Sequence, residues 1–161
     1  MIDRQIHKVE LIEASLDDVW EAWTTDEGAT TFFAPQANID LKIGGSYEIL
    51  FNPDAPEGER GAEGLKILSF LPHEMLSFEW NAPPQFPEIR KEKTWVVVQM
   101  DPVGEDKTLV GITHLGWCPG DDWEQVYQYF VRAWDIVLGR LEHRFASGPI
   151  DWNNPFTPKA D

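Results

Sequence analysis

The side chains best suited to chemistry in this sequence are four histidines and one cysteine. His114 lies in a strand-like segment, on the side shared with Val110 and Ile112 if side chains alternate, so we expect it to face the interior. A neutral imidazole there could hydrogen-bond a ligand carbonyl or phenol, or act as a general acid or base near pH 7. The alternative is a structural histidine whose ring is satisfied by Thr113 or by a backbone carbonyl.

For the other three histidines the sequence gives weaker indications of a chemical role. His7 shares the spacing of Val9 and Leu11, so it is predicted either to point inward with them or to lie at a strand edge near solvent. His73 in a turn and His143 near a helix end are expected to be solvated. No His-x-His, His-Glu-x-x-His or carboxylate cluster at ligand spacing occurs, so we predict no metal site and no cofactor.

Cys118 is the only cysteine, which excludes a disulfide within the chain and a cysteine-based metal site. A nucleophilic pair of Cys118 with His114 is disfavoured, because a strand end rarely aims both side chains at one point and a third, orienting group is missing. There is no Gly-x-Ser-x-Gly elbow and no phosphate-cradling glycine loop. Gly44-Gly45 is interpreted as a hairpin turn.

The formal net charge of −15 argues against a nucleic-acid partner and against an anionic membrane surface, because both need a basic footprint. The N-terminus runs from Met1 directly into strand-like sequence, without the apolar stretch of a signal peptide. No run approaches the roughly 18 apolar residues of a membrane span. These features predict a cytoplasmic protein.

Hydrophobic periodicity defines the elements that must position these side chains. Strand patterns are predicted at residues 4–13, 38–43, 46–51, 64–71, 76–80, 93–100 and 108–117. Two short helices are predicted at residues 15–24, where Ser15 can act as an N-cap, and 26–33. Residues 52–61 and the proline-rich residues 81–88 are expected to be loops.

From Asp121 the period changes to that of a helix. Large side chains recur every three or four residues and form one apolar stripe: Trp123, Tyr127, Phe130, Trp134, Val137, Leu141 and Phe145. This pattern predicts a helix of about 25 residues that Gly148-Pro149 ends. Because so broad a face must be buried against something large, the sheet is the only candidate. We therefore predict one α+β domain over residues 1–148 and an irregular tail over 149–161, pinned by Trp152.

Four stretches in order are similar to motifs of a known family. Ala14 to Trp20 is similar to its "A-[sp]-x-x-x-V-W" at the first helix, and Gly44 to Tyr47 resembles its turn after the second strand. Pro72 to Trp80 resembles the hairpin "P-x-x-x-L-x-F-x-W", and Thr113 to Trp117 the strand end "T-H-x-G". Across about residues 5–148 the chain resembles the helix-grip (START-related, SRPBCC) superfamily, in the branch named for the activator of the heat-shock protein 90 ATPase.

The resemblance implies a curved antiparallel sheet of about seven strands around the long C-terminal helix, with a pocket between them. The eight tryptophans and nine phenylalanines either fill a wide core or wall that pocket. The predicted pocket residues are Trp20, Trp23, Phe33, Phe78, Trp80, His114, Tyr127, Phe130 and Trp134. Tyr127 offers a hydroxyl to orient a polar ligand edge. The loop around Phe86 is interpreted as a lid or as a rigid connector.

Three functions follow as hypotheses. The first is a binding protein for a small hydrophobic or aromatic molecule. The second is a polyketide cyclase/dehydratase-like or hydrolase-like enzyme that uses His114 as acid or base. The third is an interaction module that contacts the chaperone heat-shock protein 90. Separately, an exposed Trp123 or Trp152 could form a contact with a second copy of the chain.

Overall fold

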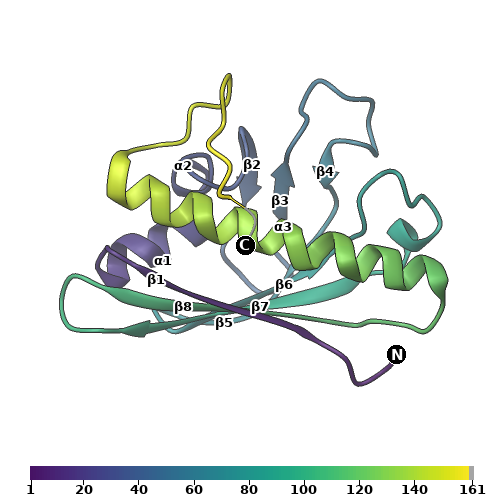
Figure 1. Ribbon diagram of the computed structural model, residues 1–161, viewed down its shortest axis with the longest axis horizontal. Helices are drawn as coiled ribbons and strands as arrows, with labels where there is room; N and C mark the ends of the chain where they lie inside the picture. The colour runs from purple at the N-terminus through teal and green to yellow at the C-terminus, as the bar shows by residue number, and fades with distance from the viewer. Residues whose placement is uncertain (160–161) are drawn as a thin grey trace.

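The computed structural model describes residues 1–159, and within them the chain forms eight strands, three α-helices and one 3₁₀ helix (Figure 1). The strands are β1 (Ile6–Ile12), β2 (Gln36–Ile39), β3 (Tyr47–Leu50), β4 (Gly61–Ala62), β5 (Ile67–Leu71), β6 (Met75–Trp80), β7 (Thr94–Pro102) and β8 (Thr108–Leu115). The helices are α1 (Leu16–Thr24), α2 (Asp26–Ala29), the 3₁₀ helix η1 (Ile89–Lys91) and α3 (Asp121–Ser147).

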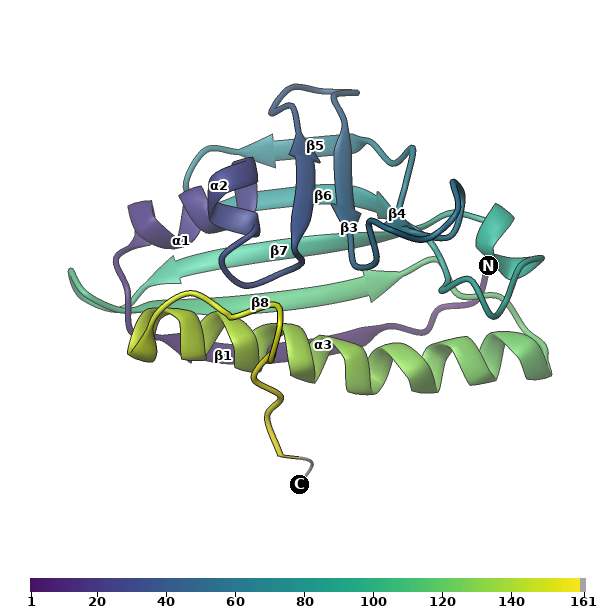
Figure 2. The same cartoon turned by 90° about the horizontal axis from the view of Figure 1, so that it is seen from above.

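The described strands pair antiparallel in two sheets, one ordered β1-β8-β7-β6-β5 and the other β2-β3-β4. A bridge between Ser46 and Lys66 joins them, and the Tyr47 N–H donates to the Leu65 carbonyl at 2.8 Å beside it. The two sheets therefore form one bent surface. Figure 1 shows α3 and the β2–β3 hairpin on the same face of the five-stranded sheet, and in Figure 2 α3 lies over β1 while the hairpin crosses in front of β5, β6 and β7. The predicted α+β helix-grip fold is confirmed.

Helix α3 forms where the apolar stripe predicted it. Its described buried residues are Val126, Phe130, Trp134, Val137, Leu138 and Leu141, which face the sheet. Asp121 and Asp122 lie in the first turn, where carboxylates favour the helix dipole. Gly148 ends the helix with a φ of 119°, a conformation that side-chain-bearing residues rarely adopt.

Short polar side chains cap the two small helices. The Ser15 hydroxyl accepts a hydrogen bond from the Asp18 N–H at 3.2 Å, as the sequence predicted. The Thr25 hydroxyl accepts from the Gly28 N–H at 2.9 Å and so starts α2 directly after α1. Helix α2 ends at Ala29, earlier than predicted, and turns continue to Phe33.

The prediction for the inner face of β1 is wrong. His7, Val9 and Leu11 are exposed, whereas Ile6 and Ile12 are buried. The residues between the two isoleucines on the inner face are charged because α3 presents charged groups to β1. Lys8, for example, forms an ion pair with Asp135 of the helix at 3.2 Å.

Two short elements also differ from prediction. The strand expected at residues 38–43 ends at Ile39, and Ile43 is 67% exposed in the following turn. Strand β4 begins in the segment predicted as a loop, where Leu50 and Gly61 pair. The extent of both strands depends on their pairing with β3, and the periodicity of a segment does not predict its partner strand.

The C-terminal tail crosses α3 (Figure 2). The Trp152 indole N–H donates to the Thr30 carbonyl at 2.7 Å. Arg132 and Arg140 of α3 donate to the carbonyls of Pro158 and Phe156 at 2.9 and 2.8 Å. The tail is therefore held along the helix by backbone carbonyls. Within residues 1–159 no helix is long and apolar enough to cross a membrane.

Candidate functional site

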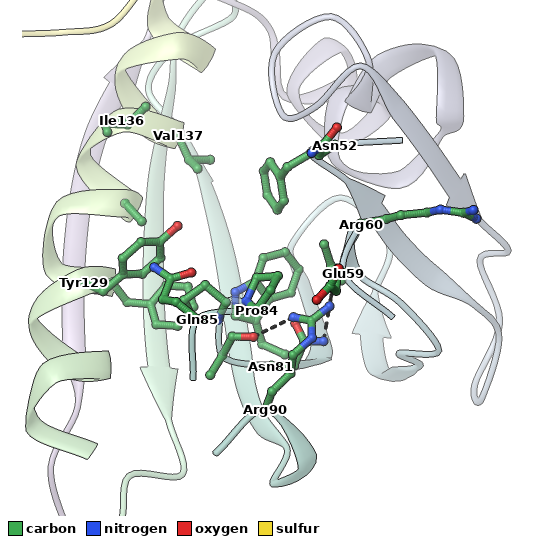
Figure 3. Close-up of a pocket in the computed structure, with 18 of the residues that line it drawn as sticks. Asn52, Glu59, Arg60, Asn81, Pro84, Gln85, Arg90, Tyr129, Ile136 and Val137 are labelled. Atoms are coloured by element: carbon green, nitrogen blue, oxygen red, sulfur yellow. Dashed lines mark hydrogen bonds between the residues drawn. The ribbon is translucent and has the colours of Figure 1, made fainter. Parts of the chain in front are cut away.

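A cavity of about 410 Å³ lies between α3, the β3–β4 pair and the loop after β6 (Figure 3). Such a volume falls within the range of small-molecule sites. One wall is a stripe of α3: Tyr129, Phe130, Ala133, Trp134, Ile136, Val137 and Arg140. The other wall consists of Phe51, Asn52, Glu59, Arg60, Gly61, Ala62, Trp80, Asn81, Ala82, Pro83, Pro84, Gln85 and Arg90.

Aromatic rings form the floor of this cavity. The rings of Trp80 and Trp134 lie 5.4 Å apart between centroids, and Phe130 stacks on Trp134 at 6.2 Å. Trp80 is only 3% exposed, whereas Phe51 and Tyr129 at the rim are 44% and 43% exposed. The cavity therefore has a buried aromatic floor and an accessible mouth.

Arg90 fixes the loop that closes one end of the cavity. Its guanidinium donates to the carbonyls of Ala82 and Gly61, both at 2.6 Å, and to that of Gly58 at 3.0 Å (Figure 3 shows the first two bonds). Glu63 lies 3.9 Å away, and burial lowers the pKa of Arg90. These bonds tie residues 81–85 to the β4 region and favour the interpretation of this loop as a rigid connector.

Three of the predicted pocket residues line this cavity: Trp80, Phe130 and Trp134. The other six, Trp20, Trp23, Phe33, Phe78, His114 and Tyr127, lie elsewhere. Trp23 packs edge-on against Phe33 at 5.4 Å, and Phe78 stacks on Tyr47 at 4.0 Å. These rings fill the core between the small helices and the sheet.

Two of the six lie near the surface of the domain. Trp20 contacts His73, with ring centroids 5.6 Å apart, and His73 is exposed beside Asp17. Tyr127 does not face a ligand: its hydroxyl donates to the Gln5 carbonyl at 3.2 Å, and the Arg4 guanidinium lies 3.4 Å above its ring. Tyr127 was predicted in the pocket because helical spacing does not distinguish the part of the α3 stripe that meets the cavity from the part that meets a strand.

His114 is fully buried, and both of its ring nitrogens are engaged. The Trp134 indole N–H donates to Nδ1 at 3.0 Å, so Nδ1 must be unprotonated. Nε2 lies 2.7 Å from the Thr94 hydroxyl and carries the proton that it donates there. Burial lowers the pKa of His114 to about 3. The hypothesis of an acid or base near pH 7 is therefore wrong: His114 is a neutral structural residue that joins β7, β8 and α3.

Sequence reasoning missed the polar residues of the cavity. Tyr129, Ala133 and Val137 recur every four residues on α3, and Arg140 follows three positions later, so helical spacing could have placed them on one face. No such signal existed for Arg90, whose acceptors lie 8, 29 and 32 residues away in sequence and are backbone carbonyls. Among the described residues, no group of three His, Cys, Asp or Glu side chains is placed to hold a metal ion.

Comparison with known proteins relates the chain to one family. The family model described as "Activator of Hsp90 ATPase homolog 1-like protein" matches residues 13–146. No curated protein gives a significant match to the sequence.

Solved structures with the same fold are distant in sequence. The Aha1 dimer from Colwellia psychrerythraea is 21% identical, covers 92% of this chain and 98% of its own, and has a TM-score of 0.67. MLL2253 from Mesorhizobium loti is 18% identical over 87% and 95%, with a TM-score of 0.69. CalU16 from Micromonospora echinospora is 22% identical over 92% and 77%, with a TM-score of 0.66. At these identities the likeness concerns the fold.

Proposed function

The chain belongs to the family of Activator of Hsp90 ATPase homolog 1-like proteins, and from that premise we propose that it binds a small hydrophobic or aromatic molecule. The site is the cavity between α3 and the sheet. The observation that carries this proposal is the cavity itself, with about 410 Å³ above a floor of Trp80, Phe130 and Trp134. Apolar walls with a few polar groups at the rim are the usual composition of a small-molecule site.

Filling the cavity from α3 tests this proposal. Ala133 lines the cavity, so Ala133→Phe places a ring where a ligand would lie. Titration with the apolar fluorescent probe N-phenyl-1-naphthylamine should show saturable binding to the wild type and at least about tenfold weaker binding to Ala133→Phe. Ala146→Phe is the matched control, because Ala146 is exposed on the same helix outside the cavity.

The melting temperature of each variant shows whether it remains folded. If folded Ala133→Phe binds the probe as tightly as the wild type, the cavity is not the binding site. A wild-type protein that takes up no apolar probe would also contradict the proposal. Native mass spectrometry of the purified protein can then identify a molecule retained from the cell.

A second candidate is self-association through the outer face of the five-stranded sheet. Val9, Leu11 and Leu109 are 49%, 40% and 37% exposed there, and Leu11 pairs directly with Leu109 across β1 and β8. The Colwellia relative is described as a dimer. Sedimentation should then show a dimer that Leu11→Lys converts to a monomer, and a wild-type monomer at high concentration would remove this candidate. The predicted contact with heat-shock protein 90 remains a prediction. A pulldown with that chaperone tests it, and the absence of a complex would contradict it.

A further inference from the structure

We propose that the molecule bound in the cavity carries an anionic group, such as a carboxylate, phenolate or sulfonate, which Arg140 holds while the aromatic floor receives the rest. This inference rests on the proposed function, since it requires that the cavity bind a ligand. It adds the chemical class of that ligand and the residue that selects it.

Arg140 is oriented by the tail yet keeps most of its donors. Its Nε donates to the Phe156 carbonyl at 2.8 Å, and the guanidinium carbon lies 5.6 Å from the centre of the Trp152 ring. An arginine has five N–H donors, so four remain on the two terminal amino groups. Within residues 1–159 none of these four donates to a protein acceptor, although Arg140 lines the cavity. The tail therefore positions a guanidinium whose free side can meet a ligand.

The charge of Arg140 lacks a counterion in the described part of the chain. No carboxylate of residues 1–159 lies within ion-pair distance of it. Its partial burial lowers the pKa of Arg140, which means that the charged form loses hydration without a compensating anion. An anionic ligand group at this position would supply that compensation through charge-assisted, bidentate hydrogen bonds.

The other two arginines of the cavity lining already donate hydrogen bonds to backbone carbonyls of the protein. Arg90 donates to three carbonyls and has Glu63 at 3.9 Å. Arg60 points away from the cavity in Figure 3, and its Nε donates to the Ala55 carbonyl at 2.8 Å. Arg140 is thus the cation of the cavity lining that remains available to a ligand within residues 1–159.

Basic side chains outnumber acidic ones in the cavity lining, whereas acidic side chains outnumber basic ones in the chain as a whole. The sequence has 28 acidic and 13 basic residues, whereas the cavity is lined by three arginines and one carboxylate, Glu59. Because a net charge of −15 repels anions in general, a preference for an anionic ligand has to come from this local reversal.

The helix wall separates the charged end of the site from its apolar part. Tyr129 and Arg140 lie eleven residues apart on α3, which corresponds to about 16 Å along the helix axis. Ala133, Ile136 and Val137 lie between them and face the cavity with apolar side chains. A ligand with its anion at Arg140 therefore places its apolar body along this wall, towards Trp134 and Trp80.

Two fluorescent probes that differ by one charged group test this inference. N-phenyl-1-naphthylamine is neutral, and 1-anilinonaphthalene-8-sulfonate has the same two aromatic groups plus a sulfonate. We compare only the binding that Ala133→Phe abolishes, so that the cavity is measured alone. The wild type should bind the sulfonate probe about tenfold more tightly than the neutral probe, and Arg140→Gln should remove this preference by weakening the binding of the sulfonate probe about tenfold more than that of the neutral probe.

Arg132→Gln is the matched control. Arg132 lies on the same helix and donates to the Pro158 carbonyl of the tail at 2.9 Å, but it does not line the cavity. Its substitution removes the same charge and a similar tail contact, so the sulfonate preference should survive. Arg140→Lys retains the charge without the guanidinium fork and should keep part of the preference.

The outcomes separate the two proposals. If the wild type binds neither probe in a manner that Ala133→Phe blocks, the proposed function fails. If both probes bind in the cavity but with equal affinity, or if Arg140→Gln weakens both to the same extent, the anionic ligand is refuted while the binding function stands. Loss of the sulfonate preference in Arg132→Gln as well would also refute it, because general electrostatics would then explain the effect.

Discussion

Acidification should remove the stability that one buried side chain, His114, contributes to the folded state. In the folded state burial lowers the pKa of His114 to about 3 from its ordinary 6.5, and Nδ1 is held unprotonated by the Trp134 indole. In the unfolded chain the imidazole regains its ordinary pKa. Between these two values the unfolded state binds one more proton than the folded state, so stability present above pH 6.5 is lost as the pH falls towards 3.

The magnitude follows from the difference between the two pKa values. Each pH unit below 6.5 costs about 1.4 kcal/mol of unfolding free energy, so about 2.7 kcal/mol is lost through His114 between pH 7.5 and pH 4.5. That is a large part of the 5–15 kcal/mol by which small domains are typically stable. The carboxylates of the chain add their own pH dependence, so His114 has to be isolated by a variant.

Urea unfolding followed by tryptophan fluorescence at several pH values measures this contribution. His114→Gln cannot titrate, so its unfolding free energy should fall by about 2.7 kcal/mol less than that of the wild type between pH 7.5 and pH 4.5. Curves that remain parallel over this range would refute the assignment of a strongly lowered pKa to His114.

A second measurement needs no variant. Nuclear magnetic resonance of the wild-type imidazoles should show His114 as the neutral Nε2–H tautomer, unchanged from pH 8 to pH 5. A His114 resonance that moves with a midpoint near 6.5 would contradict the prediction.

Two further perturbations test the core and the tail. Tyr47→Phe should lower the unfolding free energy by about 1–2 kcal/mol in urea titrations, because the buried hydroxyl donates to the Trp23 carbonyl at 2.9 Å. Tyr129→Phe at the cavity rim is its control, and an equal loss in both would contradict the role of that bond. Gly139→Ala should displace the tail, because a Cβ there would lie 2.5 Å from Cγ of Pro158. Limited proteolysis should then cut after residue 148 faster than in Ser147→Ala, whereas equal rates would show that Pro158 does not hold the tail on α3.

More of the fold than of the candidate site could be predicted from the sequence. The stripe on α3 and the Ser15 cap depend on residues within one or two helical turns, and both occur as predicted. The face of β1 was assigned wrongly, because alternation distinguishes two faces but not which of them meets charged groups on α3. His7, Val9 and Leu11 are consequently outside, although their apolar pattern indicated the opposite.

The candidate site, too, was predicted only in part from the sequence. Trp80, Phe130 and Trp134 were predicted for a pocket and do line the cavity, whereas Trp23 and Phe33 fill the core. All five are large, apolar and correctly spaced, so nothing local separates them. Close packing decides which rings interlock and which leave room beside them.

The sequence by itself determined the long helix, most of the strands and the α+β class, because periods of two and 3.6 residues are properties of the local backbone. Only the tertiary structure decided that His114 is held neutral between Thr94 and Trp134, and that Arg140 keeps donors without a partner in residues 1–159 beside an apolar floor. Those properties depend on burial and on partners at least 16 residues away in the chain, and the chemistry of a buried group is set by what surrounds it.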